Sequence, residues 1–590
     1  MPIALSLRGR SAAAFRRIAR SARGFVVRYV RRLLVGHYTR NSAGTSASAG
    51  CRRATALALL MMLPVIVQAD PQAGAAHNVA AGDFVGPYAA DGFAITIGRR
   101  AQPPIQPSAA WYFIDDYIAV PIAGHPVTRF AAAMRAIDDV AQSARTTEPG
   151  WPPMVWTGST RLLHDARIAD DGSRVVADGH AWPLTLTPKL ALNRSYFDAS
   201  SAHWLASRPL TLRGEIHDGT FVLRSAWPQD FAVDARLAPA PLPAGETVQN
   251  ALRARMRATP DGGAREPFAT TLIHARDGAP KDWSGKPALV IMVNGAQGDD
   301  DEAWGGHFAI GTGVIGEDGA ISDLLINNFY SLDIVSEKGI LAAPTPLDRY
   351  LGDLNSGQGW YRPSFLAVAV LADARAATRV QDAFNRMFEQ FWRHQIVYQH
   401  ATMNCAGISV DTLRALGWPI PRRGPTSHLL GWLSVPYALF KYRSLSQARI
   451  AYEYMIEDRT RLFPAAAFED ITADLMRLAV HGARPDDGAL AQTLAKDIVA
   501  IELLRIPQWP SSRKFGSWPV VSPGEYFGKV PKDPVDAQIV PVPPREFPAR
   551  LRDADLLREP PRRSDLPLIV WAGFVAVLLG YALRWLVRKL

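Results

Sequence analysis

One cysteine of the chain has a setting that suits nucleophilic chemistry: Cys405, in YQHATMNCAGISVDTLRALGWP. Asn404 is a favourable helix N-cap, and Gly417 with Pro419 favours a helix end, so Cys405 is predicted at the first position of a helix. A thiol there meets the positive end of the helix dipole and free backbone N–H groups, which favour the reactive thiolate and can stabilise an oxyanion. The alternative is a buried cysteine that acts as a small hydrophobic residue.

A base for this thiol must come from another part of the chain, and the best candidate is His307 in AWGGHFAIGTGVIGEDGAISDLLINNFY. His307 follows two glycines and begins a predicted strand. The GEDG sequence at 316–319 predicts a tight turn, so residues 307–315 and 320–330 should pair as a hairpin. A histidine that is merely hydrogen-bonded at a strand edge is the alternative.

The same hairpin suggests a third member of the site. If the turn is centred on Glu317 and Asp318, His307 lies opposite Asn328 and both side chains share one face of the hairpin. Asn328 is therefore predicted to orient the imidazole. A one-residue change in the turn shifts the facing position, so Asn327 and Tyr330 remain alternatives.

Metal chemistry is not expected. His394 and His400 precede the thiol, but a six-residue spacing does not place them on one helical face. The acidic run at 299–302 reads either as a solvated loop or as the rim of a cleft. No cofactor is expected for a cysteine and histidine pair.

The order of these residues resembles a known group. Histidine on one strand, a polar residue on the next and cysteine at a helix start is the order of circularly permuted papain-like (NlpC-type) cysteine enzymes, which include lecithin:retinol acyltransferase-like proteins. GGHFAIGTG and YQHATMNCAGISVDTLRALG look most like the Lnb N-terminal periplasmic domain. The resemblance implies Cys405 as nucleophile, His307 as base and Asn328 as the orienting residue, with Tyr398 and Asn404 lining the substrate pocket.

The elements that must position these residues predict an α+β fold class. A permuted papain-like catalytic domain is expected at 265–425, because strands and well-bounded helices alternate there. An accessory β-rich domain is expected at 80–250, where short alternating runs are separated by turn residues, as at Asp218-Gly219. Helical spacing at 444–463 and 485–506 predicts a C-terminal helical extension over 426–525.

The two ends of the chain carry membrane-targeting patterns. Residues 1–69 read as a basic presequence and a signal peptide, whose apolar run is 54–69. A Pro-rich linker at 526–565 precedes an uncharged stretch at 566–583, which predicts one C-terminal transmembrane helix. The predicted location is the bacterial inner membrane, with the body in the periplasm.

The positive charge does not indicate nucleic-acid binding. The formal net charge is +10, but the first 53 residues contain 12 arginines and no acidic residue, so the remaining 537 carry about −2. Expected partners are therefore membrane lipid and a cell-wall or lipid substrate, with no nucleic acid. Two functions are in view: a cysteine hydrolase or acyltransferase acting through an acyl-thioester on cell-wall amides or lipid acyl groups, and a non-catalytic binding or structural protein of the cell envelope.

Overall fold

The structure is a computed structural model. It describes residues 93–97, 117–121, 136–143, 155–158, 161–186, 197–240, 242, 245–298, 302–330, 342–354, 356–392, 396, 398–512 and 514–529. The apolar segments 54–69 and 566–583 lie outside these residues. Within the described part of the chain, no helix combines the length and apolar character needed to cross a bilayer.

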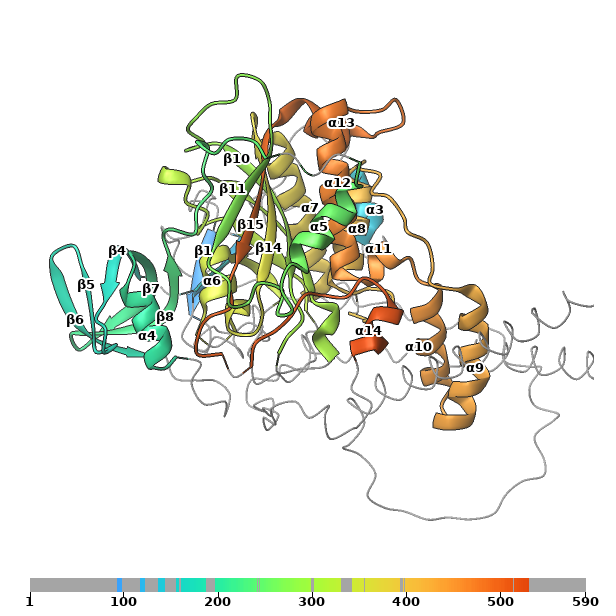
Figure 1. Ribbon diagram of the computed structural model, residues 1–590, viewed down its shortest axis with the longest axis horizontal. Coiled ribbons are helices and arrows are strands. Elements are labelled where there is room, and N and C mark those ends of the chain that lie inside the picture. Colours follow the sequence, from blue (N-terminus) through green and yellow to red (C-terminus); the bar gives the residue numbers. More distant parts are fainter. Residues whose placement is uncertain are drawn as a thin grey trace, which may run out of the picture.

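A seven-stranded antiparallel sheet forms the centre of the molecule (Figure 1). Its spatial order is β13-β12-β11-β10-β14-β15-β9, so β15, the last strand in sequence, lies between β14 and the sheet's first strand, β9. The strands are β9 (Ala269–Ala275), β10 (Pro287–Asn294), β11 (His307–Val314), β12 (Leu325–Asn328), β13 (Ala343–Pro346), β14 (Ser364–Leu371) and β15 (Ile498–Ile506).

Alternate residues of the sheet enter two different cores. In β10, Leu289, Ile291 and Val293 face a helical layer, while Val290 and Met292 face the opposite side. Because both faces are covered, the central strands are apolar almost throughout. The helices of the first layer are α3 (Ala136–Ser143), α5 (Val248–Met256), α7 (Arg375–Trp392), α8 (Cys405–Ala415), α12 (Pro464–His481) and α13 (Ala489–Asp497).

The opposite face of the sheet shares its core with a closed five-stranded barrel, seen at the left of Figure 1. Ion pairs tie the barrel to α6 (Leu347–Gly352) and the residue after it: Arg213 of β7 contacts Asp348, and Arg224 of β8 contacts Asp353 at 2.8 Å. The barrel strands are β4 (Arg161–Ile168), β5 (Arg174–Ala177), β6 (His180–Leu186), β7 (Leu210–His217) and β8 (Thr220–Pro228).

The predicted β-hairpin at Asp218-Gly219 is confirmed. These two residues connect β7 and β8, with φ values of 49° and 78°. Positive φ at both central positions is the geometry of a type I′ turn, which Asp-Gly favours. Helix α4 (Ala199–Ala206) packs beside the barrel, and a separate three-stranded sheet contains β1 (Phe93–Ile97), β2 (Tyr117–Pro121) and β3 (Val155–Gly158).

The predicted fold class is wrong. Instead of an α+β papain-like domain with a helical extension, the described chain is mixed α/β, with a barrel and a seven-stranded sheet. The predicted transmembrane helix at 566–583 lies outside the described residues and stays a prediction. The sheet does not end within 265–425, because β15 comes from the segment expected to be a helical extension. Residues 485–506, expected to be one helix, divide into α13 and β15. The run IVAIELLRI favours a strand, because its β-branched residues fit a sheet that is covered on both faces.

The rest of the 426–525 segment is helical. Helices α9 and α10 form a hairpin that projects on the side of the body away from the barrel (Figure 1). Their bounds, and those of the shorter helices near them, are α9 (His428–Tyr442), α10 (Leu445–Ile456), α11 (Arg459–Leu462) and α14 (Pro523–Lys529).

Candidate active site

Cys405 is the first residue of α8, as the sequence predicts. The Asn404 side chain caps this helix: its Oδ1 accepts a hydrogen bond from the Gly407 N–H at 2.8 Å. Its Nδ2 donates to the carbonyls of His400 and Leu462, at 2.9 and 3.0 Å. All polar atoms of this amide therefore fix the helix start in place, and its expected role in a substrate pocket stays a prediction.

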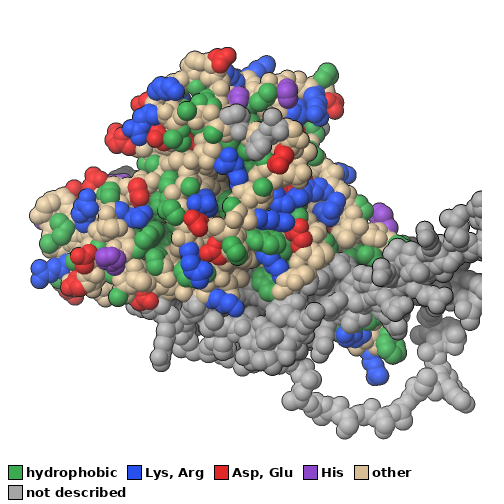
Figure 2. All heavy atoms as spheres, in the orientation of Figure 1, with side chains coloured by type: hydrophobic (Ala, Val, Ile, Leu, Met, Phe, Trp, Pro, Cys, Tyr) green, Lys and Arg blue, Asp and Glu red, His purple; other side chains and the backbone are tan. Residues whose placement is uncertain are grey.

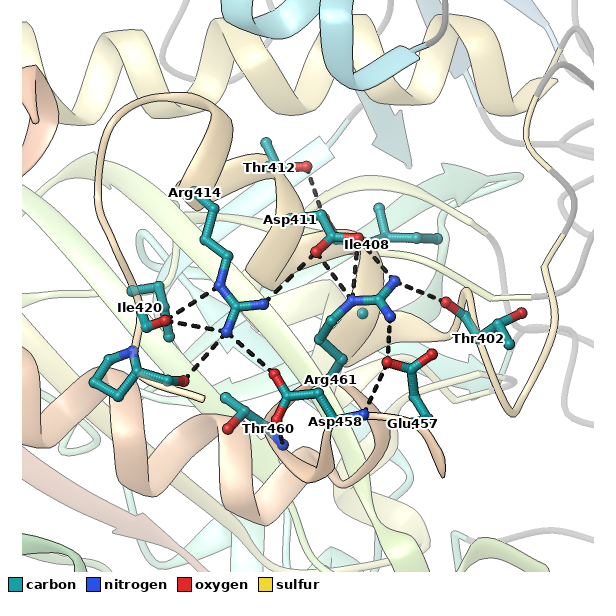
Figure 3. A network of polar contacts seen from close by, with 12 residues as sticks. Thr402, Ile408, Asp411, Thr412, Arg414, Ile420, Glu457, Asp458, Thr460 and Arg461 are labelled. Carbon is teal, nitrogen blue, oxygen red and sulfur yellow. Dashed lines mark hydrogen bonds and ion pairs between the residues drawn. The ribbon is translucent and has the colours of Figure 1, made fainter. Parts of the chain in front are cut away.

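An ion-pair network holds α8 from outside (Figure 3). Arg461 of α11 forms an ion pair with Asp411 of α8, in which Nε donates to Oδ1 at 3.0 Å. Arg461 also donates to the carbonyl of Thr402 at 2.9 Å. Arg414 donates to the carbonyl of Ile420 at 3.0 Å and to Asp458 at 3.3 Å. Arg461 thus fixes both the helix and the loop that leads into Cys405.

His307 begins β11 and is buried, with 4% of its surface exposed. Gly306, just before it, has φ 78°, and a Cβ there would lie 2.4 Å from the carbonyl oxygen of Asn294. Both the left-handed backbone and the close contact require glycine at 306, so Gly306 sets the direction in which the strand begins.

Asn328 contacts the imidazole as predicted, by a different register. Its Oδ1 lies 2.7 Å from Nε2 of His307. Asn327 pairs with Ile310, so the hairpin is shifted by two residues from the expected register, and Asn328 reaches His307 diagonally. A shift of two keeps both side chains on the same face, which explains why the contact survives.

The observed register of β11 and β12 also shows where the two alternatives for the third residue, Asn327 and Tyr330, lie relative to His307. Asn327 lies on the opposite face, where it exchanges hydrogen bonds with Gln381 of α7 at 2.9 and 3.0 Å. Continuing the register places Tyr330 opposite His307, and their ring centroids are 6.1 Å apart. Of the three candidates, only Asn328 is hydrogen-bonded to the imidazole.

The thiol and the imidazole lie close in the fold without being hydrogen-bonded to each other. The backbone N–H of Phe308, the residue after His307, lies near enough to the Cys405 sulfur to lower the pKa of the thiol. Strand alternation sends Phe308 into the core of the helical layer with Cys405 and directs His307 toward the other face, where its cross-strand neighbour is Asn294. Among the described residues, no hydrogen bond joins Sγ to the imidazole.

Electrostatics keep both groups neutral near pH 7. Burial raises the pKa of the Cys405 thiol, while hydrogen bonds from the Phe308 N–H, the Tyr398 hydroxyl and the Ala406 N–H, and the charge of Arg362, act against it. Burial, and next the charge of Arg362, lower the pKa of His307 to about 3, although the bond to Asn328 opposes this. The expected thiolate is therefore not favoured here, since burial outweighs the helix N-terminus.

Three polar residues that the sequence did not single out form a hydrogen-bonded cluster, of which Asn294 is the cross-strand neighbour of His307. Asn294 faces His307 across the β10–β11 pair, accepts a hydrogen bond from the Tyr350 hydroxyl at 2.5 Å and donates to Ser364 at 2.8 Å. Asn294 ends an apolar strand directly before Gly295, and a polar residue at that position was the available signal.

Arg362 is the buried cation of the site. Its guanidinium donates to the Gln358 side chain at 2.6 and 2.9 Å and to the carbonyl of Gly295 at 3.3 Å. Its charge reaches both the thiol and the imidazole. Nothing in its local sequence, WYRPSF, separates it from an ordinary surface arginine.

Tyr398 lies beside Cys405. The backbone N–H of Cys405 donates to its hydroxyl at 3.4 Å, and the ring lies 6.4 Å from that of Tyr330. His394 and the acidic residues 299–301 are outside the described residues. The described part of the chain contains no group of three or more histidine, cysteine or acidic residues that could hold a metal ion.

Comparisons with known proteins identify no relative of this chain. No family model matches the chain, and neither the curated proteins nor the solved structures include a match.

Proposed function

We propose that the protein is a cysteine hydrolase or acyltransferase in which Cys405 attacks the carbonyl of a cell-wall amide or a lipid acyl group. The observation that carries the proposal is a thiol at the capped start of α8, beside the backbone of a strand whose first residue is a histidine held by an asparagine. A nucleophile, a base and an orienting residue are the parts that such chemistry needs.

The proposed first step transfers the thiol proton to His307. Because the Asn328 oxygen accepts from Nε2–H, Nδ1 is the nitrogen left to take a proton. The sulfur then forms a bond to the carbonyl carbon, and the leaving amine or alcohol departs with the proton from the imidazolium. Water or an acceptor hydroxyl attacks the acyl-thioester and restores the thiol.

Two features of the site support this assignment. The first N–H groups of α8 lack intrahelical acceptors, and a substrate oxyanion could take the N–H of Cys405 from the Tyr398 hydroxyl, to which it donates at 3.4 Å. The imidazole is neutral, as a base must be, although a pKa of about 3 makes His307 a weak base until its surroundings change. The thiol packs in the core of the helical layer and the imidazole is directed to the other face of the sheet, so the transfer of the thiol proton requires a rearrangement at the start of β11 that brings the two groups together when substrate binds.

One observation favours the second candidate, a non-catalytic envelope protein. Cys405 is 4% exposed, and burial raises the pKa of its thiol, as expected for a cysteine that serves only in packing. Location at an envelope remains a prediction from residues 54–69 and 566–583.

A test for covalent chemistry distinguishes the two. The full chain is incubated with p-nitrophenyl esters of short acyl chains in one arm and with peptidoglycan fragments in the other, and intact mass is followed with time. We expect an acyl adduct on the parent, none on Cys405→Ala, and formation slowed about 100-fold or more in His307→Ala. The matched control is Cys51→Ala, which should react like the parent.

The two arms also separate the substrates. Adduct from the ester alone favours acyl transfer from lipid, whereas cleavage of the fragments favours an amidase. If the parent forms no adduct in either arm and Cys405→Ala leaves peptidoglycan and lipid profiles of cells unchanged, the enzymatic proposal is wrong.

A further inference from the structure

Helix α9 presents a row of apolar side chains to solvent. Leu429 is 69% exposed, Leu433 51% and Phe440 89%, and Trp432 is 45% exposed. Together with Pro436, these residues follow the spacing of one face of a helix, and we call them the α9 stripe. Single exposed apolar residues are ordinary, but a continuous row of this kind marks a binding surface.

The stripe is not needed to hold the helix in place. The opposite face of α9 has its own core, in which Ala438 packs with Ala448, Ala451 and Met455 of α10. Gly431 allows this close packing, since a Cβ there would lie 2.8 Å from the side chain of Ile456. The hairpin is therefore closed on its inner side. Leu429, Leu433 and Phe440 are exposed on the other side, while Trp432, at the edge of the stripe, contacts Tyr452 of α10 with ring centroids 5.3 Å apart.

The charges on α9 and at its two caps have one sign. From 427 to 444 the chain contains no acidic residue, while Lys441 and Arg443 lie at the C-terminal end of α9 and are exposed. Arg443 has φ 48°, at a C-cap where glycine is the favourable residue. A cation is thus kept at a position where its backbone conformation is costly.

We propose that the α9 stripe docks on the surface of a bilayer that contains anionic phospholipid. An apolar helix face with aromatic side chains, bordered by cations, suits burial at the level of the headgroups. Leu429, Leu433 and Phe440 enter the acyl boundary, while Lys441 and Arg443 contact lipid phosphates. A second copy of the chain is a less favourable partner than a bilayer. Pairing two α9 stripes would bring the cations of both copies together, and α9 has no acidic residue to pair with them.

The test measures amide hydrogen exchange of α9 in the full chain. The protein is compared without vesicles, with phosphatidylcholine vesicles and with vesicles that also contain phosphatidylglycerol. We expect exchange of α9 to slow only with vesicles, most strongly with phosphatidylglycerol, and the effect to weaken at high salt. A readout confined to α9 is not changed by attachment through another part of the chain.

Variants separate the apolar and charged contributions. Leu429→Ser with Phe440→Ser should abolish the slowing, while Val480→Ser, a matched change on the exposed side of α12, should not. Arg443→Gly should weaken binding to anionic vesicles about fivefold, the value of one cation near such a surface, even though it removes a strained residue and makes the protein more stable.

Three outcomes would overturn the proposal. Exchange of α9 that is equally slow without vesicles would show that another segment of the chain covers the stripe. Slowing that depends on protein concentration would show a second copy. Exchange that vesicles of either composition leave unchanged would show that the stripe does not bind lipid.

Discussion

Two opposing effects act on the protonation state of the Cys405 thiol. Burial favours the neutral thiol, whereas three hydrogen-bond donors and the charge of Arg362 favour the thiolate. Substrate binding that brings further donors, or displaces the apolar contacts, would change this balance. The side chain of Tyr398 is the donor that a single substitution removes most cleanly, because it contributes a hydroxyl and no backbone group.

Tyr398→Phe is expected to raise the pKa of the Cys405 thiol further and to slow its alkylation near neutral pH. The physical reason is the loss of a hydroxyl that stabilises the thiolate. The pH dependence of iodoacetamide labelling, followed by mass spectrometry, measures the effect. Tyr452→Phe on α10 is the control and should label like the parent. An unchanged labelling profile in Tyr398→Phe would show that the hydroxyl does not act on the sulfur.

At the scale of elements, the start of α8 is set by contacts from α11. Arg461 joins Asp411, Glu457 and the carbonyl of Thr402, and its side chain is mostly buried. A lysine keeps the charge but cannot make the two-pronged contact with the carboxylate and also reach the carbonyl. The position of Cys405 relative to β11 therefore depends on a residue that touches neither the thiol nor the imidazole.

Arg461→Lys is expected to lower the free energy of unfolding by about 1–2 kcal/mol and to slow acylation of Cys405 about tenfold. Urea unfolding and the adduct assay measure the two effects. The control is Arg449→Lys, which alters an i,i+4 pair with Glu453 on a remote helix and should change stability by less than about 0.5 kcal/mol. Unfolding and acylation both equal to the parent would mean that the network does not position α8.

Elements with local signals were predictable, and elements that depend on distant partners were not. The bounds of α8 follow from Asn404 and Gly417, which act within a few residues of the helix. The register of β11 and β12 was wrong by two, because turn type decides it and several types fit GEDG. Strand β15 was missed because its neighbours, β14 and β9, lie more than 120 and 220 residues earlier, and no local pattern reports them.

The same limit applies to the candidate site. Cys405, His307 and Asn328 stood out by residue type and by neighbouring turns or caps. Arg362 and Tyr350 did not, because their position beside the site is produced by the packing of α6 and the loop before β14. The pKa of the thiol was likewise not predictable, since it depends on how deeply the helix start is buried.

At the scale of the whole molecule, a buried carboxylate joins the sheet to the segment that follows the barrel. Glu502 lies on β15, fully buried, on the face shared with the barrel. Its two oxygens accept from the Asp234 backbone N–H at 3.2 Å, and the Thr270 hydroxyl of β9 also contacts it. Burial raises the pKa of Glu502 to about 8, so it is mostly protonated at pH 7.

This raised pKa makes stability fall as pH rises. Below the ordinary value of 4.5 the carboxyl is protonated in both states and has no effect on the pH dependence; between 4.5 and about 8 the folded state holds a proton that the unfolded state has released. The stability associated with that proton is lost as pH rises through about 8. Glu502→Gln removes the titration and keeps an oxygen that can accept from Asp234.

We therefore expect Glu502→Gln to unfold at higher urea concentration than the parent above pH 8, and to differ little from it below pH 4.5. Urea unfolding across this range, read as the difference between variant and parent, isolates Glu502 from other titrating groups. Glu453→Gln on α10, which pairs with Arg449 away from β15, serves as the control for the loss of one carboxylate. A difference for Glu502→Gln that is constant from acid to alkaline pH would show that the carboxyl titrates normally and that the barrel-side face of β15 is open to water.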